Sequence, residues 1–71
     1  MPESCIKIID SLIEERNKQG KTQRDIAEAT GFSQSVIARL ESKKVTPKLD
    51  TLLKVAAALN QSIEIVPTNR Q

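Results

Sequence analysis

Three side chains between residues 34 and 39 could form specific hydrogen bonds with a ligand. Gln34, Ser35 and Arg39 lie on the same side of a helix at about 100° per residue, with the small Ala38 between them. Glutamine and arginine are the side chains that form paired hydrogen bonds with the edges of adenine and guanine in the major groove of DNA. A small neighbour would let the helix approach the floor of the groove. The spacing therefore predicts a helix face that contacts DNA bases.

Two short helices joined by a glycine turn are predicted to hold this face in place. Thr22 can cap the first helix, because its hydroxyl can accept a hydrogen bond from a free amide of the first turn, and Asp25 can complete a capping box. Gly31 can adopt a positive φ at no steric cost, so the chain can turn sharply there. A second helix, capped by Ser33, is expected to run to about Ser42. Its core-facing side is expected to carry Ser33, Val36, Ile37 and Leu40.

Apolar residues at helical spacing predict two further helices, one on each side of this unit. The first runs to about Lys18 and ends near Gly20. Its apolar stripe consists of Cys5, Ile9, Leu12 and Ile13. The other covers residues 48–59, since Pro47 marks its start and Asn60 can end it in a left-handed conformation. Its expected buried face consists of Leu49, Leu52, Leu53, Ala56 and Leu59, with Val55 adjacent to it.

From Thr22 onward the chain reads T-Q-x-x-[IL]-A-x-x-x-G-x-S-Q-x-x-[IV]-x-x-[IL]-E, followed by a proline and a leucine-rich helix that ends in A-x-A-L. This pattern resembles the Cro/repressor-like (XRE) helix-turn-helix proteins over residues 12–59. The resemblance implies an all-α fold, a compact helix-turn-helix bundle of four main helices. It also implies that the third helix is a DNA recognition helix, whose contacts with base edges would come from Gln34, Ser35 and Arg39.

The resemblance further implies a tie between the first and third helices. Arg16 stands at the end of an apolar stripe, and in the family an arginine here commonly pairs with the glutamate that ends the recognition helix, which is Glu41. We expect a partly buried pair that fixes the geometry of the two helices, with two independent surface charges as the alternative. In the family, a glutamine at the position of Gln23 touches the DNA backbone and braces the first glutamine of the recognition helix.

Hydroxyls and cations around the predicted recognition helix could contact phosphates. Residues 39–54 contain five cations and two anions, and this excess of positive charge can neutralise phosphates. A solvated lysine surface is the alternative. Residues 42–47 form a connecting loop whose amides could also contact the backbone. The predicted phosphate contacts are those of Thr22, Gln23, Ser33, Lys43, Lys44 and Thr46.

The sequence period changes after Asn60. Residues 62–66 alternate and are β-branched, so they predict a short C-terminal strand over residues 62–67 that Pro67 ends. A single strand in a helical chain leaves its backbone amides and carbonyls without hydrogen-bond partners. Pairing with the same strand of a second copy across a two-fold axis would supply these partners. The alternative is an extended tail that lies on its own domain. We therefore predict a DNA-binding domain over residues 1–61, a flexible tail over residues 68–71, and a dimer interface made by Ile63, Ile65 and Val66.

Composition narrows the classes of function. A chain of 71 residues predicts one domain, and its net charge of +2 is only mildly basic. One cysteine and no histidine exclude most metal sites and any cysteine–histidine catalytic pair, so we expect no metal, no cofactor and no enzymatic activity. Cys5 is expected to be a small buried hydrophobe. No signal sequence or membrane-length apolar run is present, which predicts no membrane contact and a cytoplasmic, DNA-associated location in a bacterium or phage.

These patterns predict a transcriptional regulator that binds double-stranded DNA in a sequence-specific way and acts as a repressor. A homodimer would recognise a near-palindromic operator through the third helix. The C-terminal strand also resembles the endings of small repressors that accompany toxins in bacterial toxin–antitoxin pairs. The alternative function is therefore an antitoxin-type module that binds a toxin partner and regulates its own operon.

Overall fold

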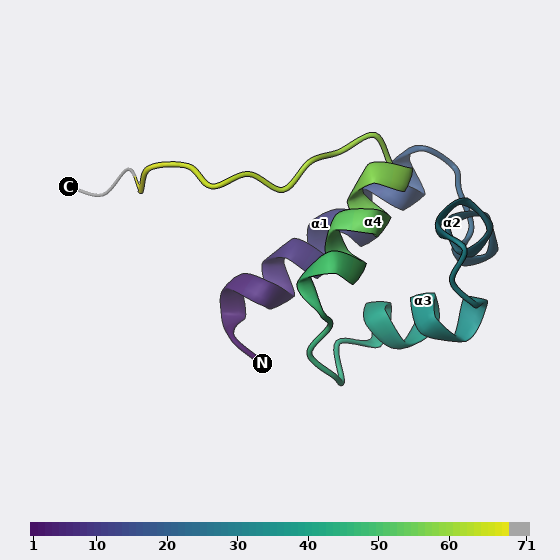
Figure 1. The fold of residues 1–71 in the computed structure, drawn as a ribbon, viewed down its shortest axis with the longest axis horizontal. Helices are drawn as coiled ribbons and strands as arrows, with labels where there is room; N and C mark the ends of the chain where they lie inside the picture. Colours follow the sequence, from purple (N-terminus) through teal and green to yellow (C-terminus); the bar gives the residue numbers. More distant parts are fainter. Residues whose placement is uncertain (69–71) are drawn as a thin grey trace.

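The computed structural model describes residues 1–68 and contains four helices within that range (Figure 1). They are α1 (Glu3–Lys18), α2 (Gln23–Thr30), α3 (Gln34–Ser42) and α4 (Leu49–Ala58). This arrangement confirms the predicted all-α helix-turn-helix bundle. Among the described residues no helix is long and apolar enough to cross a membrane. Apart from Thr68, the flexible tail predicted for residues 68–71 lies outside the described residues.

The helix boundaries follow from the predicted local signals. Thr22 and Asp25 form a reciprocal capping box at the start of α2, with hydrogen bonds of 2.8 and 3.0 Å. Gly31 ends α2 with a φ of 81°, in the left-handed region that favours glycine. The Ser33 hydroxyl accepts a hydrogen bond from the amide of Val36 at the start of α3. At the other end of α3, Lys43 adopts a φ of 61°, which is unusual for a residue with a side chain.

All four helices contribute to one hydrophobic core. Its buried members are Ile9, Leu12, Ile26, Ala27, Ile37, Leu40, Leu52, Val55, Ala56 and Leu59. Cys5, Ile8 and Ile63 are partly buried and pack against this cluster. Since α2 and α3 each contribute buried residues, the core determines which side of α3 remains at the surface.

The predicted buried face of α4 is wrong at two positions. Leu49 is 64% exposed and Leu53 is 42% exposed, whereas Leu52 and Val55 are almost completely buried. On a helix of ten residues the stripe that faces the other helices includes Val55, and this rotates Leu49 and Leu53 to its edge. Periodicity could not distinguish two neighbouring leucine stripes, because both have helical spacing. Val36 on α3 is likewise 40% exposed.

After α4 the chain continues as an extended segment, residues 61–68, which we call the tail. It leaves the helical bundle and projects to one side (Figure 1). Within the described chain the tail forms no strand ladder, so the predicted strand is not formed by a single copy, and its pairing with a second copy stays a prediction. Ile63 packs on the core, but Ile65 and Val66 are 103% and 69% exposed.

Candidate nucleic-acid interface

The outer side of α3 carries the three residues predicted to contact bases. Gln34, Ser35 and Arg39 are all exposed, as is Ala38 between them. On the opposite side of the same helix Ile37 is completely buried and Leu40 is 3% exposed. The structure therefore brings the predicted base-contact residues together on one free surface, with the helix backbone anchored behind them.

Thr22 and Ser33, two of the predicted phosphate contacts, lie at the N-termini of α2 and α3. Each hydroxyl oxygen accepts a hydrogen bond from a backbone amide of its own helix. A hydroxyl that accepts in this way keeps its own O–H donor, which can still be directed to a phosphate oxygen. Both residues are exposed, and helix N-termini attract anions. The caps thus leave both residues able to donate to phosphate.

The cations predicted to form one patch have different surroundings. Lys43 Nζ lies 2.6 Å from Asp10 Oδ1 on α1, in a half-exposed ion pair. Lys54 Nζ lies 5.4 Å from the centre of the Phe32 ring. Lys44 and Thr46 are exposed in the loop after α3. A phosphate at Lys43 would have to replace the Asp10 carboxylate, whereas the structure shows no salt bridge for Lys44 within the described chain.

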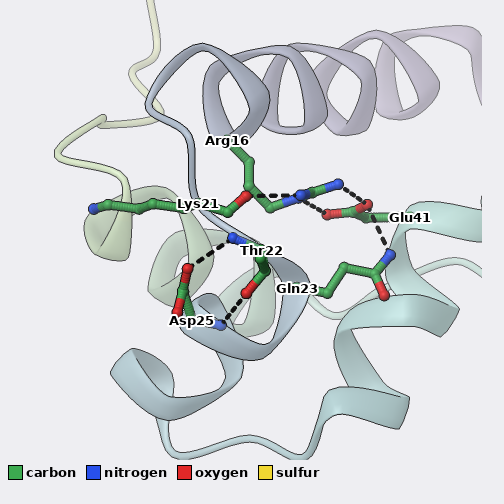
Figure 2. A network of polar contacts seen from close by, with 6 residues as sticks. All are labelled: Arg16, Lys21, Thr22, Gln23, Asp25 and Glu41. Atoms are coloured by element: carbon green, nitrogen blue, oxygen red, sulfur yellow. Dashed lines mark hydrogen bonds and ion pairs between the residues drawn. The ribbon is translucent and has the colours of Figure 1, made fainter.

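A polar network joins α1, α2 and α3 (Figure 2). Arg16 and Glu41 form a two-pronged ion pair, with Nε–Oε2 and Nη2–Oε1 distances of 2.7 and 2.9 Å. The side chains of Arg16 and Glu41 are only 14% and 12% exposed. Arg16 Nη1 also donates to the carbonyl oxygen of Lys21 at 2.9 Å. The contact between Arg16 and Glu41 is the one that the family resemblance implies.

Gln23 takes part in the same network. Its Nε2 donates to Glu41 Oε1 at 3.0 Å (Figure 2). The resemblance implied a brace to Gln34, but the hydrogen bond that the structure gives Gln23 is to Glu41. Since Glu41 closes α3 and Gln23 opens α2, this bond sets the relative position of the two motif helices. The sequence did not predict Glu41 as the partner of Gln23. It also did not predict the Lys21 carbonyl as a partner of Arg16, or Asp10 as the partner of Lys43.

The capping box at the start of α2 changes the acidity of its carboxylate. The Thr22 backbone amide and the Thr22 hydroxyl favour the charged form, and nearby Lys21 adds to this, so the pKa of Asp25 lies below its ordinary value. The lowered pKa means that the capping hydrogen bonds favour the ionised carboxylate of Asp25. In the part of the chain that the structure describes, no group of three or more acidic or cysteine side chains could hold a metal ion.

A model of the helix-turn-helix family matches residues 12–66, most of this chain. The chain belongs to the helix-turn-helix family, in its Cro/repressor-like (XRE) branch. The match begins within α1 and extends through the motif helices and α4 into the tail. The matched region thus includes both the α3 surface and the segment that carries Ile63 and Ile65.

Two related proteins are similar to this helix-turn-helix chain. An uncharacterized HTH-type transcriptional regulator of Haemophilus influenzae is 37% identical over 62 residues, covering 87% of this chain. The chain spans only 63% of that relative's length. A solved structure described as a toxin-antitoxin module from Streptococcus pneumoniae superposes with a TM-score of 0.75 at 45% identity. That superposition covers 92% of this chain and 71% of the solved chain.

Proposed function

We propose that this protein is a sequence-specific regulator of transcription that binds double-stranded DNA and acts as a repressor. The observation that carries the proposal is the exposed face of Gln34, Ser35 and Arg39 on α3, in a chain of the helix-turn-helix family. The relative in Haemophilus influenzae, described as a transcriptional regulator, supports it. We propose no catalytic activity for this protein. Its proposed location is the cytoplasm, where it would be associated with DNA.

In the proposed complex α3 lies in the major groove. Arg39 donates two hydrogen bonds to a guanine edge, Gln34 donates one to and accepts one from an adenine edge, and Ser35 adds a single one. Thr22, Gln23, Ser33, Lys43, Lys44 and Thr46 contact phosphates and thereby set the register of the helix on the duplex. The network around Glu41 maintains the angle between α2 and α3 while these contacts form. Repression follows because the bound protein occupies the site that polymerase needs.

The proposed active form is a homodimer. Residues 1–61 are the DNA-binding domain, and the strand over residues 62–67 joins two copies through Ile63, Ile65 and Val66. Exposed Ile65 and Val66 support this assignment, because apolar side chains of a strand are normally covered. A two-fold dimer would bind a near-palindrome with half-sites about 10 base pairs apart.

A second function, an antitoxin-type module that binds a toxin partner and regulates its own operon, is favoured by one observation. The similar solved structure is described as a toxin-antitoxin module, and it shares 45% of its residues with this chain over the superposed part. The two functions are compatible, since a module that regulates its own operon would also bind DNA through the α3 surface.

Selection from random duplex DNA at near-physiological salt, followed by sequencing of the bound fraction, tests the proposed function. We expect enrichment of a palindrome with half-sites about one helical turn apart. The Arg39→Ala variant should weaken this enrichment and relax the enriched sequence, whereas Lys18→Ala, at an exposed α1 position outside the predicted DNA contacts, should leave it unchanged. Weak retention without any enriched sequence would contradict the regulator, and co-purification of a second protein from the native host would then favour the partner-binding function.

A further inference from the structure

A hollow of about 320 Å³ lies between α1 and the beginning of the tail. Ile8, Leu12 and Ala56 supply its apolar surface, Ser11 lies beside them, and Lys7 and Glu15 are the charged residues of its α1 side. Residues 61–63 line the opposite side. We call this hollow the α1 socket. It is an open groove with an apolar floor, and it has room for a branched aliphatic side chain.

The tail carries an apolar side chain that its own chain leaves uncovered. Ile63 packs on the core next to the α1 socket, so alternate residues of the extended tail face the helices on the same side as Ile63. Ile65 is one of these, yet it is 103% exposed because the tail has by then left the helical bundle (Figure 1). The uncovered isoleucine of one copy and the apolar hollow of another copy are therefore complementary surfaces.

We propose that the α1 socket of each copy receives Ile65 of a second copy, so that α1 forms part of the dimer interface together with the tail. This inference rests on the proposed homodimer and adds the register of the two tails and the residues that receive them. The proposed interface includes Ile8 and Ser11 of α1, which the strand pattern alone does not place in the interface.

The register follows from symmetry and charge. A two-fold axis that relates two antiparallel strands passes midway between one residue and the same residue of the second copy, because directly opposed residues must point to the same face. The possible central residues are Ile63, Glu64 and Ile65. A centre at Glu64 would place two like charges directly opposite each other, which destabilises a strand pair. The centre is therefore Ile63 or Ile65.

The position of the α1 socket distinguishes these two registers. With the centre at Ile63, Ile65 of the second copy lies opposite Gln61, which lines the socket. With the centre at Ile65, the two Ile65 side chains meet each other about 7 Å further along the strand, away from the socket. Only the first register covers Ile65 with the apolar surface of α1.

A backbone hydrogen bond at the start of the tail agrees with the centre at Ile63. The amide of Gln61 already donates to the carbonyl of Ala56 at 2.8 Å, so it is not available for a strand partner. Gln61 and the opposed Ile65 therefore form a non-hydrogen-bonded pair, and by alternation so do the two Ile63 residues. Side chains approach most closely in such pairs, and the ladder bonds fall on Ser62 and Glu64.

Cross-linking between two different chains tests the socket. In a Cys5→Ala background, one preparation carries Ser11→Cys and the other Ile65→Cys, and the mixture is treated with a short bismaleimide. We expect a covalent heterodimer that contains one chain of each kind. The matched control replaces Ser11→Cys with Asn17→Cys, an exposed position on another side of α1, and should give little product.

A second variant measures the energetic role of the socket. Ser11 is exposed, so Ser11→Arg should leave the fold intact by circular dichroism, while its side chain fills the hollow. We expect the dimer dissociation constant to rise at least tenfold by sedimentation equilibrium, and Asn17→Arg to leave it unchanged.

The outcomes separate the two levels of the proposal. A dimer that gives no Ser11–Ile65 cross-link and tolerates Ser11→Arg would overturn the socket and leave the homodimer standing. A monomer that links these positions within one doubly substituted chain would show that its own tail fills the socket. That result, or a monomer without any link, would overturn both the socket and the proposed homodimer.

Discussion

Glu41 at the end of α3 and Ile65 in the tail have opposite surroundings. The Glu41 side chain is 12% exposed and accepts hydrogen bonds from both Arg16 and Gln23 of its own chain. Ile65 is 103% exposed and belongs to a segment without ladder bonds in the described chain. The comparison teaches that a single copy completes the support of α3 but leaves the apolar side chain of Ile65 uncovered.

Removal of the tail gives the strongest test of this difference. A chain that ends at Gln61 should keep its helical fold but lose the proposed dimer, because the strand and Ile65 are gone. We expect the dimer dissociation constant to rise more than about 1,000-fold, which corresponds to about 4 kcal/mol. Sedimentation velocity over a range of concentrations measures it.

The control for this deletion is a chain that ends at Thr68, which retains the whole predicted strand. It should dimerise like the full chain. If the chain that ends at Gln61 still sediments as a dimer, the interface lies elsewhere. The exposed Leu49 and Leu53 on α4 would then be the first surface to mutate.

The next largest effect is expected from Arg16→Met. The substitution leaves the mostly buried Glu41 carboxylate without its cation, so we expect a loss of about 3 kcal/mol of unfolding free energy. For a domain of this size, such a loss lowers the melting temperature by roughly 12 °C or more. Thermal unfolding followed by circular dichroism measures it.

Arg24→Met is the matched control for the buried pair. Arg24 Nε lies 3.9 Å from Glu28 Oε2, and these side chains are 78% and 73% exposed. An exposed pair of this kind contributes less than about 1 kcal/mol. Equal losses in the two variants would show that the pair between Arg16 and Glu41 has no special structural role.

Changes on the recognition surface should weaken DNA binding without affecting the fold. Arg39→Ala should cost roughly 1–3 kcal/mol on the selected operator and relax the sequence preference, because it removes a proposed base contact. Lys44→Ala should weaken operator and random DNA alike and reduce the salt slope by about one. Fluorescence anisotropy titrations at several salt concentrations measure both. Losses that are equal on the two DNAs for both variants would contradict the assignment of Arg39 to bases.

The smallest effect concerns Asp25 and pH. Because its pKa in the folded protein lies below the ordinary value of 3.8, the charged carboxylate stabilises the fold at neutral pH. This contribution is present above that value and is lost as the pH falls through the lowered pKa. The Asp25→Asn variant should therefore have a lower melting temperature than the wild type at neutral pH. The difference in melting temperature should disappear in strong acid. Glu28→Gln is the control, and a difference that does not change with pH would contradict the capping role.

Much of the bundle could be predicted because its signals are local. Thr22, Asp25 and Gly31 determine the ends of α2 through hydrogen bonds and backbone conformations that span only a few residues. The outer face of α3 followed from helical spacing for the same reason. Arg16 and Glu41 are 25 residues apart, and only the resemblance to a family suggested that they meet.

The errors and omissions concern tertiary placement. Leu49 and Leu53 satisfy helical periodicity as well as Leu52 does, and only the rotation of α4 against the other helices exposes them. The ion pair between Lys43 and Asp10 joins residues 33 positions apart on elements whose packing angle no local pattern specifies. The hydrogen bond from Gln23 to Glu41 was not predicted, because it depends on the position of the end of α3 relative to α2.

Lys43 occupies a backbone position at which evolution and protein engineering would favour different residues. Its φ of 61° costs a residue with a side chain roughly 1 kcal/mol, and glycine would avoid this strain. A screen for thermostability should therefore favour Lys43→Gly, as long as the relief of strain exceeds the loss of the exposed pair with Asp10. The winner of such a screen would carry one cation fewer beside α3, so thermostability and the proposed binding of an operator would be selected in opposite directions at this residue.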